Sequence, residues 1–337
     1  MAGRRTNLAL FGLLALALAT GALAYGIGTS WGRWAVVAHG AAGLGIVLLG
    51  PWKTAIARRG LRRERAGRRA SLALVALVAL VVTTGVLHAT GLGVSLGPAT
   101  SMQVHVGAAL LSIPLAVWHV MARRVRPRTT DLSRRALLRA GAVAGGSVAA
   151  WAGVEAVSHL TALPGSRRRF TGSHERGSFR PAAMPVTQWL DDVVPSIDPA
   201  AWRLAIARGD APPRMLSLAE LGPARDRVRA VLDCTGGWYA EQEWAGIRLD
   251  QLLEDLPTGT RSVVARSATG YARRFPVGDL PAMLLALDVG GRPLAAGHGA
   301  PARIVAPGRR GFWWVKWVVS LEASETPWWW QPPFPLT

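Results

Sequence analysis

The sequence contains a single cysteine, Cys234, among its 337 residues. One cysteine excludes a disulfide within the chain, and it excludes an iron–sulfur cluster held by cysteines, because such clusters need several thiolates. Any electron relay in this chain therefore uses other groups. Acidic residues are also scarce, since 20 Asp and Glu stand against 39 Lys and Arg, which gives a net charge of +19. Such an excess is typical of nucleic-acid-binding proteins or of membrane proteins, and its placement decides between them.

Most of the positive charge lies in three short stretches, and each stretch borders an apolar run. The stretches are Arg4 and Arg5, then residues 53–69, then residues 123–139. Basic segments beside apolar runs are the positive-inside pattern of membrane proteins. We therefore interpret the charge as an orientation signal, and we expect no nucleic acid as a partner.

Apolar runs long enough to cross a bilayer occupy the first half of the sequence. A spanning helix needs about 20 apolar residues at about 1.5 Å per residue. Five runs approach this length, of which the last is the richest in Ala and Gly: 8–27, 34–49, 72–88, 104–121 and 136–157. With the basic stretches in the cytoplasm, five crossings leave everything after about His159 outside. The sequence thus predicts a multi-pass protein of the cell membrane whose C-terminal domain lies on the extracytoplasmic face.

We divide the chain into three parts. Residues 1–125 form a four-helix transmembrane bundle, residues 126–163 a basic loop with the fifth transmembrane helix, and residues 164–337 a domain outside the bilayer. In the middle part, Ser133-Arg134-Arg135-Ala136-Leu137-Leu138-Arg139 resembles a twin-arginine export signal, and an ordinary basic helix flank is the alternative.

From Pro164 the apolar runs are short and alternate with Gly, Pro and charged residues, which predicts a mixed α+β domain. We expect strands at 228–233, 262–266, 302–306 and 313–321, and short helices at 249–256 and 280–287.

Cys234 follows a predicted strand and opens a Gly-containing turn, Cys234-Thr235-Gly236-Gly237-Trp238. A lone cysteine there is most often a small buried hydrophobic residue. Two later segments, Ser267-Ala268-Thr269-Gly270-Tyr271 and Gly297-His298-Gly299-Ala300-Pro301-Ala302-Arg303, precede Trp314-Val315-Lys316. In this order and spacing, the three blocks resemble the metal-ligand segment, the second cofactor loop and the signature of the sulfite oxidase family.

The resemblance implies an α+β molybdopterin-binding catalytic domain in which Cys234 ligates molybdenum. A thiolate is a soft ligand suited to such a centre, and the phosphate of the pterin calls for arginine, lysine and backbone amides. The implied pterin contacts are Thr269, His298, Arg303, Trp314, Val315 and Lys316, together with a looser match at Ser173, His174 and Glu175. Tyr271 and Arg273 are further catalytic candidates, with Arg273 approaching the pocket from the next loop. For Arg303 the alternative is a surface ion pair, and for His298 a loop histidine with satisfied hydrogen bonds.

The implied reaction is oxygen-atom transfer on a small sulfur-oxo or related substrate, by sulfoxide reduction or sulfite oxidation. Sulfite oxidases proper carry arginines directly after the metal cysteine, where this chain has Thr235 to Trp238. The domain is more similar to the protein-methionine-sulfoxide reductases of the family, which implies a small-molecule or protein sulfoxide as substrate. The alternative is a non-catalytic membrane-anchored binding protein on the same fold.

Four of the seven histidines lie in or at the ends of apolar runs: His39, His88, His105 and His119. Ionisable residues within a membrane are costly and usually functional. The 14-residue spacing of His105 and His119 puts them nearly on one helix face and resembles diheme cytochrome b bundles. One outer haem b is favoured over two haems. Its iron would lie between His105 and either His39 or His88, and we take His39 and His105 as the candidate ligands. Electrons would then pass to or from the quinone pool or another redox partner. A plain helical anchor is the alternative.

Overall fold

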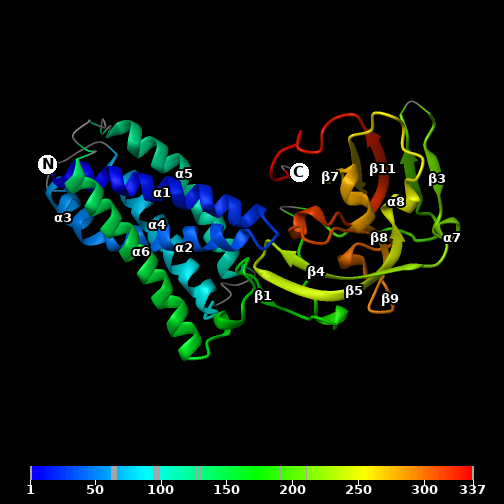
Figure 1. The fold of residues 1–337 in the computed structure, drawn as a ribbon, viewed down its shortest axis with the longest axis horizontal. Coiled ribbons are helices and arrows are strands. Elements are labelled where there is room, and N and C mark those ends of the chain that lie inside the picture. Colours follow the sequence, from blue (N-terminus) through cyan, green and yellow to red (C-terminus); the bar gives the residue numbers. More distant parts are fainter. Residues whose placement is uncertain are drawn as a thin grey trace. The chain divides into compact units, whose positions relative to one another are not determined.

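The computed structural model describes residues 2–61, 67–93, 99–123, 125, 128, 131, 133–189, 192–209 and 211–335. The chain forms two compact units, Met1–His174 and Glu175–Thr337 (Figure 1). The segment between Pro164 and His174 lies in the helical unit. In that segment the Arg168 guanidinium donates a 2.8 Å hydrogen bond to the Ala89 carbonyl and forms an ion pair with Glu155.

The first unit is helical, and all five predicted apolar runs are helices. The helices are α1 (Ala2–Gly26), α2 (Gly32–Leu48), α3 (Gly50–Leu61), α4 (Arg68–Thr90), α5 (Ser101–Ala122) and α6 (Arg134–Leu160). Among the described residues, α1, α4, α5 and α6 are long and apolar enough to cross a membrane, and α2 with α3, bent by 40°, makes a fifth span if the pair is counted as one. Pro51 in the first turn of α3 is compatible with this break, because it has no N–H to offer a preceding helical turn.

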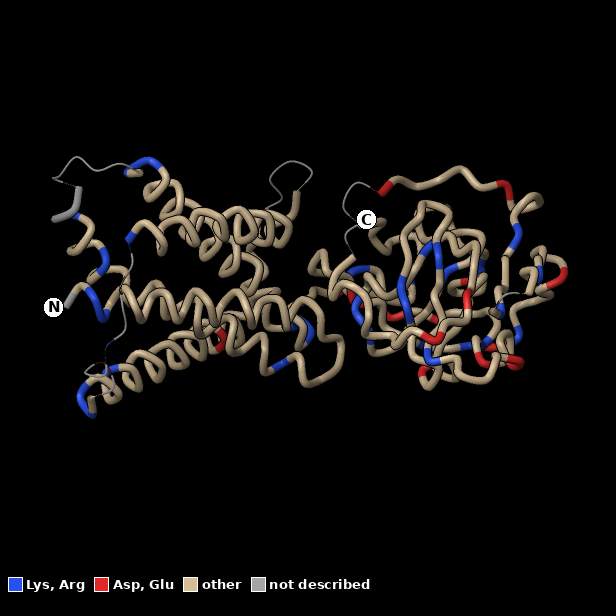
Figure 2. The backbone as a smooth tube through the Cα atoms, turned by 90° about the horizontal axis from the view of Figure 1, so that it is seen from above, with Lys and Arg blue, Asp and Glu red and all other residues tan. Residues whose placement is uncertain are grey.

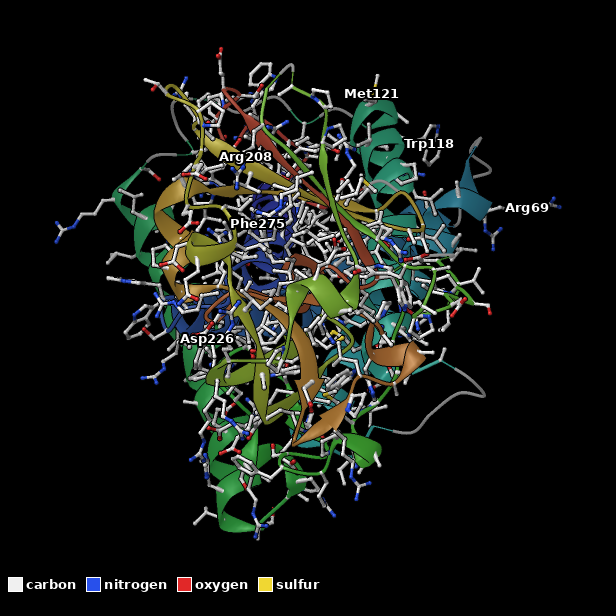
Figure 3. All side chains as sticks on the ribbon, turned by 90° about the vertical axis from the view of Figure 1, so that its right-hand side faces the viewer. Arg69, Trp118, Met121, Arg208, Asp226 and Phe275 are labelled. Atoms are coloured by element: carbon white, nitrogen blue, oxygen red, sulfur yellow. The ribbon has the colours of Figure 1, made fainter. Side chains whose placement is uncertain are left out.

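Charge is concentrated toward the ends of these helices (Figure 2). Arg69, in the first turn of α4, projects away from the ribbon (Figure 3). Several predicted basic and outer-loop residues lie outside the described residues, namely 62–66, 94–98, 124, 126 and 127.

Hydroxyl groups inside the apolar helices are satisfied within their own helix. Thr20 Oγ1 donates to the Leu16 carbonyl at 2.6 Å, and Thr84 Oγ1 donates to the Leu80 carbonyl at 2.7 Å. Ser147 makes the same kind of bond to the carbonyl four residues earlier. A polar group without water must find its partner in the protein, so these helices meet the requirement for an apolar surrounding.

The helical unit is built from pairs of neighbouring helices. Helix α1 packs on α2, α4 packs on α5, and α6 packs on α2. Small buried residues lie at these contacts, among them Ala41 and Ala42 on α2 and Ala108 on α5. Small side chains let helix backbones approach closely, as is common in membrane helix pairs.

The second unit contains two β-sheets (Figure 1). One has the order β5-β8-β10, with β4 paired to β5 and β9 to β8, and the other has the order β3-β2-β11-β6-β7. The pairs are antiparallel except for the parallel pair of β11 and β2. The strand bounds are β1 His174–Glu175, β2 Leu204–Ala207, β3 Arg214–Leu216, β4 Asp226–Cys234, β5 Trp238–Arg248, β6 Ser262–Ser267, β7 Ala272–Pro276, β8 Leu284–Val289, β9 Arg292–Pro293, β10 Arg303–Val305 and β11 Val318–Ser324.

One hydrophobic core draws on both sheets. Trp244 on β5 and Leu285 on β8 come from the first sheet, while Phe275 on β7 (labelled in Figure 3) and Leu321 on β11 come from the second, and all four are at most 1% exposed. Two short helices, α7 (Leu218–Leu221) and α8 (Leu249–Leu252), and several 3₁₀ turns connect the strands. The domain is therefore the mixed α and β structure that the sequence predicted.

The predicted strands at 228–233, 262–266 and 302–306 are confirmed as β4, β6 and β10. The helix predicted at 280–287 is wrong, because Leu284–Val289 is β8; a short, wholly buried apolar run has the same pattern in a helix and in a central strand. The predicted helix 249–256 is helical only at Leu249–Leu252, and the strand predicted at 313–321 begins at Val318, after a 3₁₀ turn at Gly311–Trp313.

The β5–β8 pairing depends on a glycine. At Gly246 a Cβ atom would lie 2.0 Å from the Leu285 carbonyl oxygen, so the two backbones approach too closely for any side chain. We expect Gly246→Ala to lower the free energy of unfolding of this unit by about 3 kcal/mol or more, because the clash is with backbone. Gly278→Ala is the matched control, since nothing lies within 4 Å of a Cβ there, and it should change stability by less than about 0.5 kcal/mol. Urea denaturation followed by tryptophan fluorescence measures both, and equal stabilities would contradict the expectation.

Candidate functional site

Cys234 is the last residue of β4, where the β4–β5 hairpin turns. Its register partner is Trp238, and Gly237 in the turn has a φ of +89°, a conformation that favours glycine. The Gly236 N–H points back to the sulfur, with a nitrogen–Sγ distance of 3.3 Å. The thiol is half-buried and free. The hairpin turn thus fixes one sulfur atom at the rim of the sheet.

The sulfur faces a pocket built from five stretches of chain. The lining comes from residues 185–192, 232–238, 267–271, 298–303 and 311–317. The lining residues are Pro185, Thr187, Gln188, Trp189, Asp192, Leu232, Cys234, Thr235, Trp238, Ser267, Tyr271, His298, Arg303, Gly311, Phe312, Trp314, Lys316 and Trp317. All three sequence blocks therefore contribute to one cavity.

The surroundings of the Cys234 thiol favour opposite protonation states. Burial raises the pKa of the thiol, whereas the Gly236 N–H, the Arg310 guanidinium, the Thr187 hydroxyl and the Lys316 ammonium lower it, and the net direction is upward. Arg310 itself forms a buried ion pair with Asp233 and donates to the Cys234 carbonyl at 3.3 Å. A bound cation at the sulfur would remove the cost of burying the thiolate, as metal coordination does for cysteine.

Arg303, the first residue of β10, is a buried cation that lines the pocket. It is 1% exposed, and its Nη1 and Nη2 atoms donate to the carbonyls of His298 and Trp314 at 3.0 and 3.2 Å. Its guanidinium lies 5.0 Å from the centre of the Trp244 ring, and its Nε has no hydrogen-bond partner. Burial lowers the pKa of Arg303 to about 9.

Lys316 is the second buried cation of the pocket. Its Nζ atom donates to the carbonyls of Gly297 and Thr187 at 2.7 and 2.9 Å and to the Gln188 side-chain oxygen at 3.1 Å. Burial, followed by the neighbouring positive charge of Arg303, lowers the pKa of Lys316 to about 7. All three acceptors are neutral.

Neither cation has an ion-pair partner among the carboxylates of the residues that the structure describes. Buried charges are ordinarily paired, because an unpaired charge in a low-dielectric site costs several kcal/mol. Two unpaired cations beside a thiol that faces the same pocket therefore fit an anionic ligand that also brings a metal to the sulfur. The donor set matches a phosphate-bearing pterin with a thiolate-bound metal.

The remaining residues of the third sequence block lie around these two cations. His298 is buried at the end of a 3₁₀ turn, with Nε2 3.1 Å from the Met184 carbonyl, and burial lowers its pKa. Trp314 lines the pocket and donates from Nε1 to the Arg309 carbonyl at 3.1 Å. Val315 is buried in the core and is not among the residues that line the pocket. Its backbone carbonyl accepts a hydrogen bond from the Ile304 N–H at 2.7 Å.

Gly311 allows the chain to pass beside the cysteine. A Cβ at this position would lie 3.1 Å from the Cys234 Cα and 3.3 Å from the Asp233 carbonyl oxygen. The sulfur-bearing strand end and the 311–317 segment are thus in van der Waals contact. This approach brings Lys316 and Cys234, which are far apart in the sequence, to one cavity.

The second block contributes in part. Tyr271 lines the pocket, and its hydroxyl donates to the Phe312 carbonyl. Thr269 is exposed and is not among the lining residues; its hydroxyl is 3.2 Å from Asp192 Oδ2. Arg273 is also absent from the lining. It is 2% exposed, its guanidinium lies 4.1 Å from the centre of the Trp313 ring, Nη1 donates to the Pro332 carbonyl at 3.2 Å, and burial lowers its pKa to about 10.

The looser first block, Ser173, His174 and Glu175, is not among the lining residues either. Ser173 is fully buried and His174 contacts His88, with ring centres 4.9 Å apart, so both belong to the helical unit. Glu175 is exposed, and its carboxylate accepts from the Ser178 N–H at 2.6 Å. The structure therefore gives these three residues roles in connecting segments of the chain.

Sequence reasoning missed the segment that covers one wall of the pocket. Thr187, Gln188, Trp189 and Asp192 lie in an irregular stretch before β2. This stretch is tied down by the Trp238 Nε1 atom, which donates to Thr187 Oγ1 at 3.0 Å, and by Lys316. It carries no periodic pattern and no unusual residue spacing, so only its contacts identify it.

The histidines of the apolar helices lie at three places. The rings of His39 and His105 lie 5.7 Å apart, and His88 contacts His174. His119 lies 3.3 Å from Ser71 Oγ through Nδ1. No cluster of three or more His, Cys, Asp or Glu side chains able to hold a metal ion occurs among the residues with described positions.

Comparison with known proteins gives matches for the second unit. Residues 191–330 match the family described as "Oxidoreductase molybdopterin binding domain". The chain is 29% identical over 175 residues to the mitochondrial sulfite oxidase of Rattus norvegicus, covering 41% of this chain and 32% of that protein. It is 28% identical over 145 residues to the protein-methionine-sulfoxide reductase catalytic subunit MsrP of Xanthomonas axonopodis pv. citri, covering 37% of this chain and 45% of that protein. The chain thus spans less than half the length of either relative.

Among solved structures, the sulfane dehydrogenase SoxCD of Paracoccus pantotrophus is similar with a TM-score of 0.37 and 25% identity, over 40% of each chain.

The depressed pKa of Lys316 predicts a pH-dependent cost in the cofactor-free protein. The pKa is about 7 in the folded state against 10.5 for an ordinary lysine. Because the folded pKa is the lower one, the cost is absent above about pH 10.5, grows as the pH falls and is complete below about pH 7. The Lys316→Met variant lacks the titrating group. The difference between its unfolding free energy and that of the wild-type protein should therefore increase as the pH falls from 10 to 7, by up to about 1.4 kcal/mol per pH unit.

Urea denaturation of both cofactor-free proteins across this pH range measures the difference. Arg292→Met, at an exposed position on β9, is the control and should differ from wild type by a constant amount. A constant difference for Lys316→Met as well would contradict a buried, titrating ammonium.

Proposed function

Because this chain carries an enzyme domain of the sulfite oxidase family of molybdopterin-dependent oxidoreductases, we propose that it performs oxygen-atom transfer on a sulfur-oxo substrate from the extracytoplasmic face of the cell membrane. The observation that carries the proposal is the free Cys234 thiol in a pocket with two buried cations, Arg303 and Lys316, that have no ion-pair partner among the carboxylates the structure describes.

The residues of the pocket fit a molybdenum-molybdopterin cofactor. Cys234 would ligate molybdenum, while Arg303 and Lys316 would bind the anionic end of the pterin, and Trp314 with His298 would line its path. When bound, the cofactor supplies two-electron oxygen-atom chemistry. The chain's own contribution is to hold the sulfur at a rigid hairpin turn, to neutralise the anion and to keep water out with Trp189, Phe312 and Trp238.

Sulfoxide reduction fits this pocket better than sulfite oxidation. A sulfite dianion calls for cations that are not already engaged, yet the only Arg and Lys among the lining residues are the two assigned to the pterin. Arg273, a catalytic candidate from the sequence, lies over the Trp313 ring and does not line the pocket, so it is not placed to bind an anion there. A neutral sulfoxide needs only an apolar, aromatic mouth, which Trp189, Tyr271 and Phe312 provide. The reaction consumes two electrons and two protons, and it converts R₂SO to R₂S and H₂O.

The electrons need a route from the membrane. We propose that the five spans cross the cell membrane, that the basic loops lie in the cytoplasm, and that the helical unit exchanges electrons with the quinone pool or another redox partner. The four apolar helices, the fifth bent pair and the basic residues between them support this orientation. Whether export of α6 uses the twin-arginine-like segment 133–139 is separate from the final topology.

Reporter fusions test this topology. An alkaline phosphatase domain joined after Leu163 should be active, because it would lie outside the cytoplasm, whereas a fusion after Gly67 should be inactive. A cytoplasmic fluorescent reporter at the same two positions should give the reverse pattern. Active phosphatase at Gly67, or inactive phosphatase at Leu163, would refute the orientation.

Cys234→Ser tests the proposed metal site. A serine hydroxyl is a harder ligand and stays protonated, so molybdenum content should fall to background and dye-driven reduction of methionine sulfoxide should fall at least about 100-fold. Lys316→Met and Arg303→Met should lower pterin content about 10- to 100-fold. Arg292→Met, an exposed cation on β9, is the matched control and should keep full content and turnover.

The purified full chain is analysed for molybdenum and assayed with sulfite and with methionine sulfoxide, which distinguishes sulfite oxidation from sulfoxide reduction. If the protein turns over sulfite but not methionine sulfoxide, sulfite oxidation replaces sulfoxide reduction as the proposed reaction. Full molybdenum content and activity in Cys234→Ser would refute the proposal.

A further inference from the structure

The helical unit contains an internal repeat. Residues 3–23 read GRRTNLALFGLLALALATGAL, and residues 67–87 read GRRASLALVALVALVVTTGVL, so more than half of the aligned positions are identical. Helices α1 and α4 are therefore equivalent. Each packs on the helix that follows it in the sequence: α1 packs on α2, and α4 packs on α5. The second helices share His39 and His105, and each histidine is followed 13 residues later by a tryptophan, Trp52 or Trp118.

The repeat holds both histidines in the same way. His39 Nδ1 lies 2.9 Å from the Ala17 carbonyl, and His105 Nδ1 lies 2.8 Å from the Val81 carbonyl. Ala17 and Val81 occupy equivalent positions in the two copies.

The glycines four residues later are equivalent too. A Cβ at Gly21 would be 3.0 Å from His39 Cε1, and a Cβ at Gly85 would be 3.0 Å from His105 Cε1. Each copy thus uses a glycine to seat the ring edge and a carbonyl to fix its orientation.

These two positions bring the rings together edge-on within the apolar unit. Their centres are 5.7 Å apart and their planes are 83° apart. Since each Nδ1 donates its proton to a carbonyl, each Nε2 carries the free lone pair, and neither Nε2 has a hydrogen-bond partner in the described part of the chain. A neutral imidazole anchored through its other nitrogen is the usual state of a metal-ligating histidine.

Two histidines without a third protein ligand restrict what can bind. No cluster of three or more metal-ligating side chains exists in the described ranges, and a zinc ion needs three or four protein ligands. Haem iron brings four ring nitrogens of its own and takes two axial ligands. With metal–nitrogen bonds of roughly 2 Å, two axial imidazoles would have ring centres roughly 6 Å apart, close to the separation found here.

We propose that His39 and His105 are the axial ligands of one haem b, held between the two copies of the repeat. This inference deepens the proposed function, because it names the carrier for the electron exchange. Ferric iron accepts one electron from the membrane donor and becomes ferrous, and it returns to ferric on passing that electron on. Two such cycles, with two protons from water, match the two electrons that reduction of one sulfoxide consumes.

The same repeat explains why only one haem is expected. Fourteen residues after each histidine, the copies carry Lys53 and His119. Lys53 Nζ donates to Asn7 at 2.9 Å, and His119 Nδ1 lies 3.3 Å from Ser71, where Asn7 and Ser71 are again equivalent positions. The second level therefore has the same architecture but one histidine, and a protonated lysine offers no lone pair.

His88 is not available as the second ligand. Its Nε2 lies 2.9 Å from the Gly172 carbonyl, and its own carbonyl lies 2.9 Å from His174 Nε2. These contacts attach the 172–174 segment to the end of α4. The alternative pairing of His105 with His88 is thus replaced by the pairing of His105 with His39.

The test uses the full chain purified in detergent from cells supplied with a haem precursor. We expect about one haem b per chain, with the absorption and electron paramagnetic resonance of low-spin iron with two nitrogen ligands. His39→Ala and His105→Ala should each lower haem content at least tenfold. His105→Gly should regain a low-spin spectrum when imidazole is added. His88→Ala and His119→Ala are the matched controls and should keep the wild-type spectrum.

Haem-free wild-type protein would overturn the inference, and so would unchanged haem content and spectra in both His39→Ala and His105→Ala. Molybdenum content and dye-driven turnover are measured on the same samples and should be unchanged in these variants, which shows that they fold. Haem without molybdenum would refute the proposed function and leave this site standing, whereas molybdenum without haem would do the reverse.

Discussion

The second unit is organised around two buried basic side chains, Arg303 and Lys316, that have no carboxylate within ion-pair distance among the described residues. Arg303 and Lys316 give their hydrogen bonds to neutral acceptors, chiefly backbone carbonyls, and burial lowers the pKa of both. Burying such groups without negative charge nearby is costly, so an anionic ligand in the pocket would stabilise both side chains. Both side chains are held in place by their surroundings. The Thr187 and Gly297 carbonyls accept hydrogen bonds from Lys316, and the Trp244 ring lies near the Arg303 guanidinium. The thiol of Cys234 has the opposite need, because its burial becomes favourable only when a cation binds the sulfur. One anionic, metal-bearing cofactor satisfies all three groups at once.

The rigidity of this site comes from backbone features rather than from the ligating residues themselves. A hairpin turn with Gly237 at positive φ aims the sulfur, and Gly311 lets the Lys316 segment pass against the same strand end. The Asp233–Arg310 ion pair fixes the residue directly before Cys234. These features are one to five residues from a predicted ligand in the sequence: Asp233 and Gly237 flank Cys234, and Gly311 precedes Lys316. Substitution of the neighbours would therefore displace the sulfur without changing its chemistry, and a site assembled this way tolerates little motion between its cation pair and its thiol.

Sequence patterns predicted what depends on local composition. The apolar runs and the position of Cys234 after a strand needed only neighbouring residues. The blocks containing His298, Arg303 and Lys316 came from the resemblance to a known family, and the structure brings these blocks into one pocket. The pattern failed where burial on both faces makes a strand look like a helix, at Leu284–Val289, and where an irregular wall has no period, at residues 187–192. Arg273 and Thr269 lie in the predicted segment but do not line the pocket, because the Arg273 side chain packs on the Trp313 ring and Thr269 is exposed. Tertiary contacts, which no local pattern records, decide such cases.

The helical unit shows a different kind of information in the sequence. Hydropathy identifies the apolar helices but does not detect that α1 and α4 are related in sequence, because Leu, Ala and Val are compatible with a membrane helix in any order. The two Gly-Arg-Arg segments and the two Thr-Gly pairs have no reason to recur at matched positions unless the hairpins descend from one unit. A duplicated hairpin places equivalent residues opposite each other, so one histidine position in the ancestral unit gives two neighbouring imidazoles, His39 and His105. The same symmetry places Lys53 opposite His119, and there the two copies have diverged. One level of the bundle keeps two imidazoles and the other keeps one, so the repeat distinguishes the level at which we propose a haem from the level at which we do not.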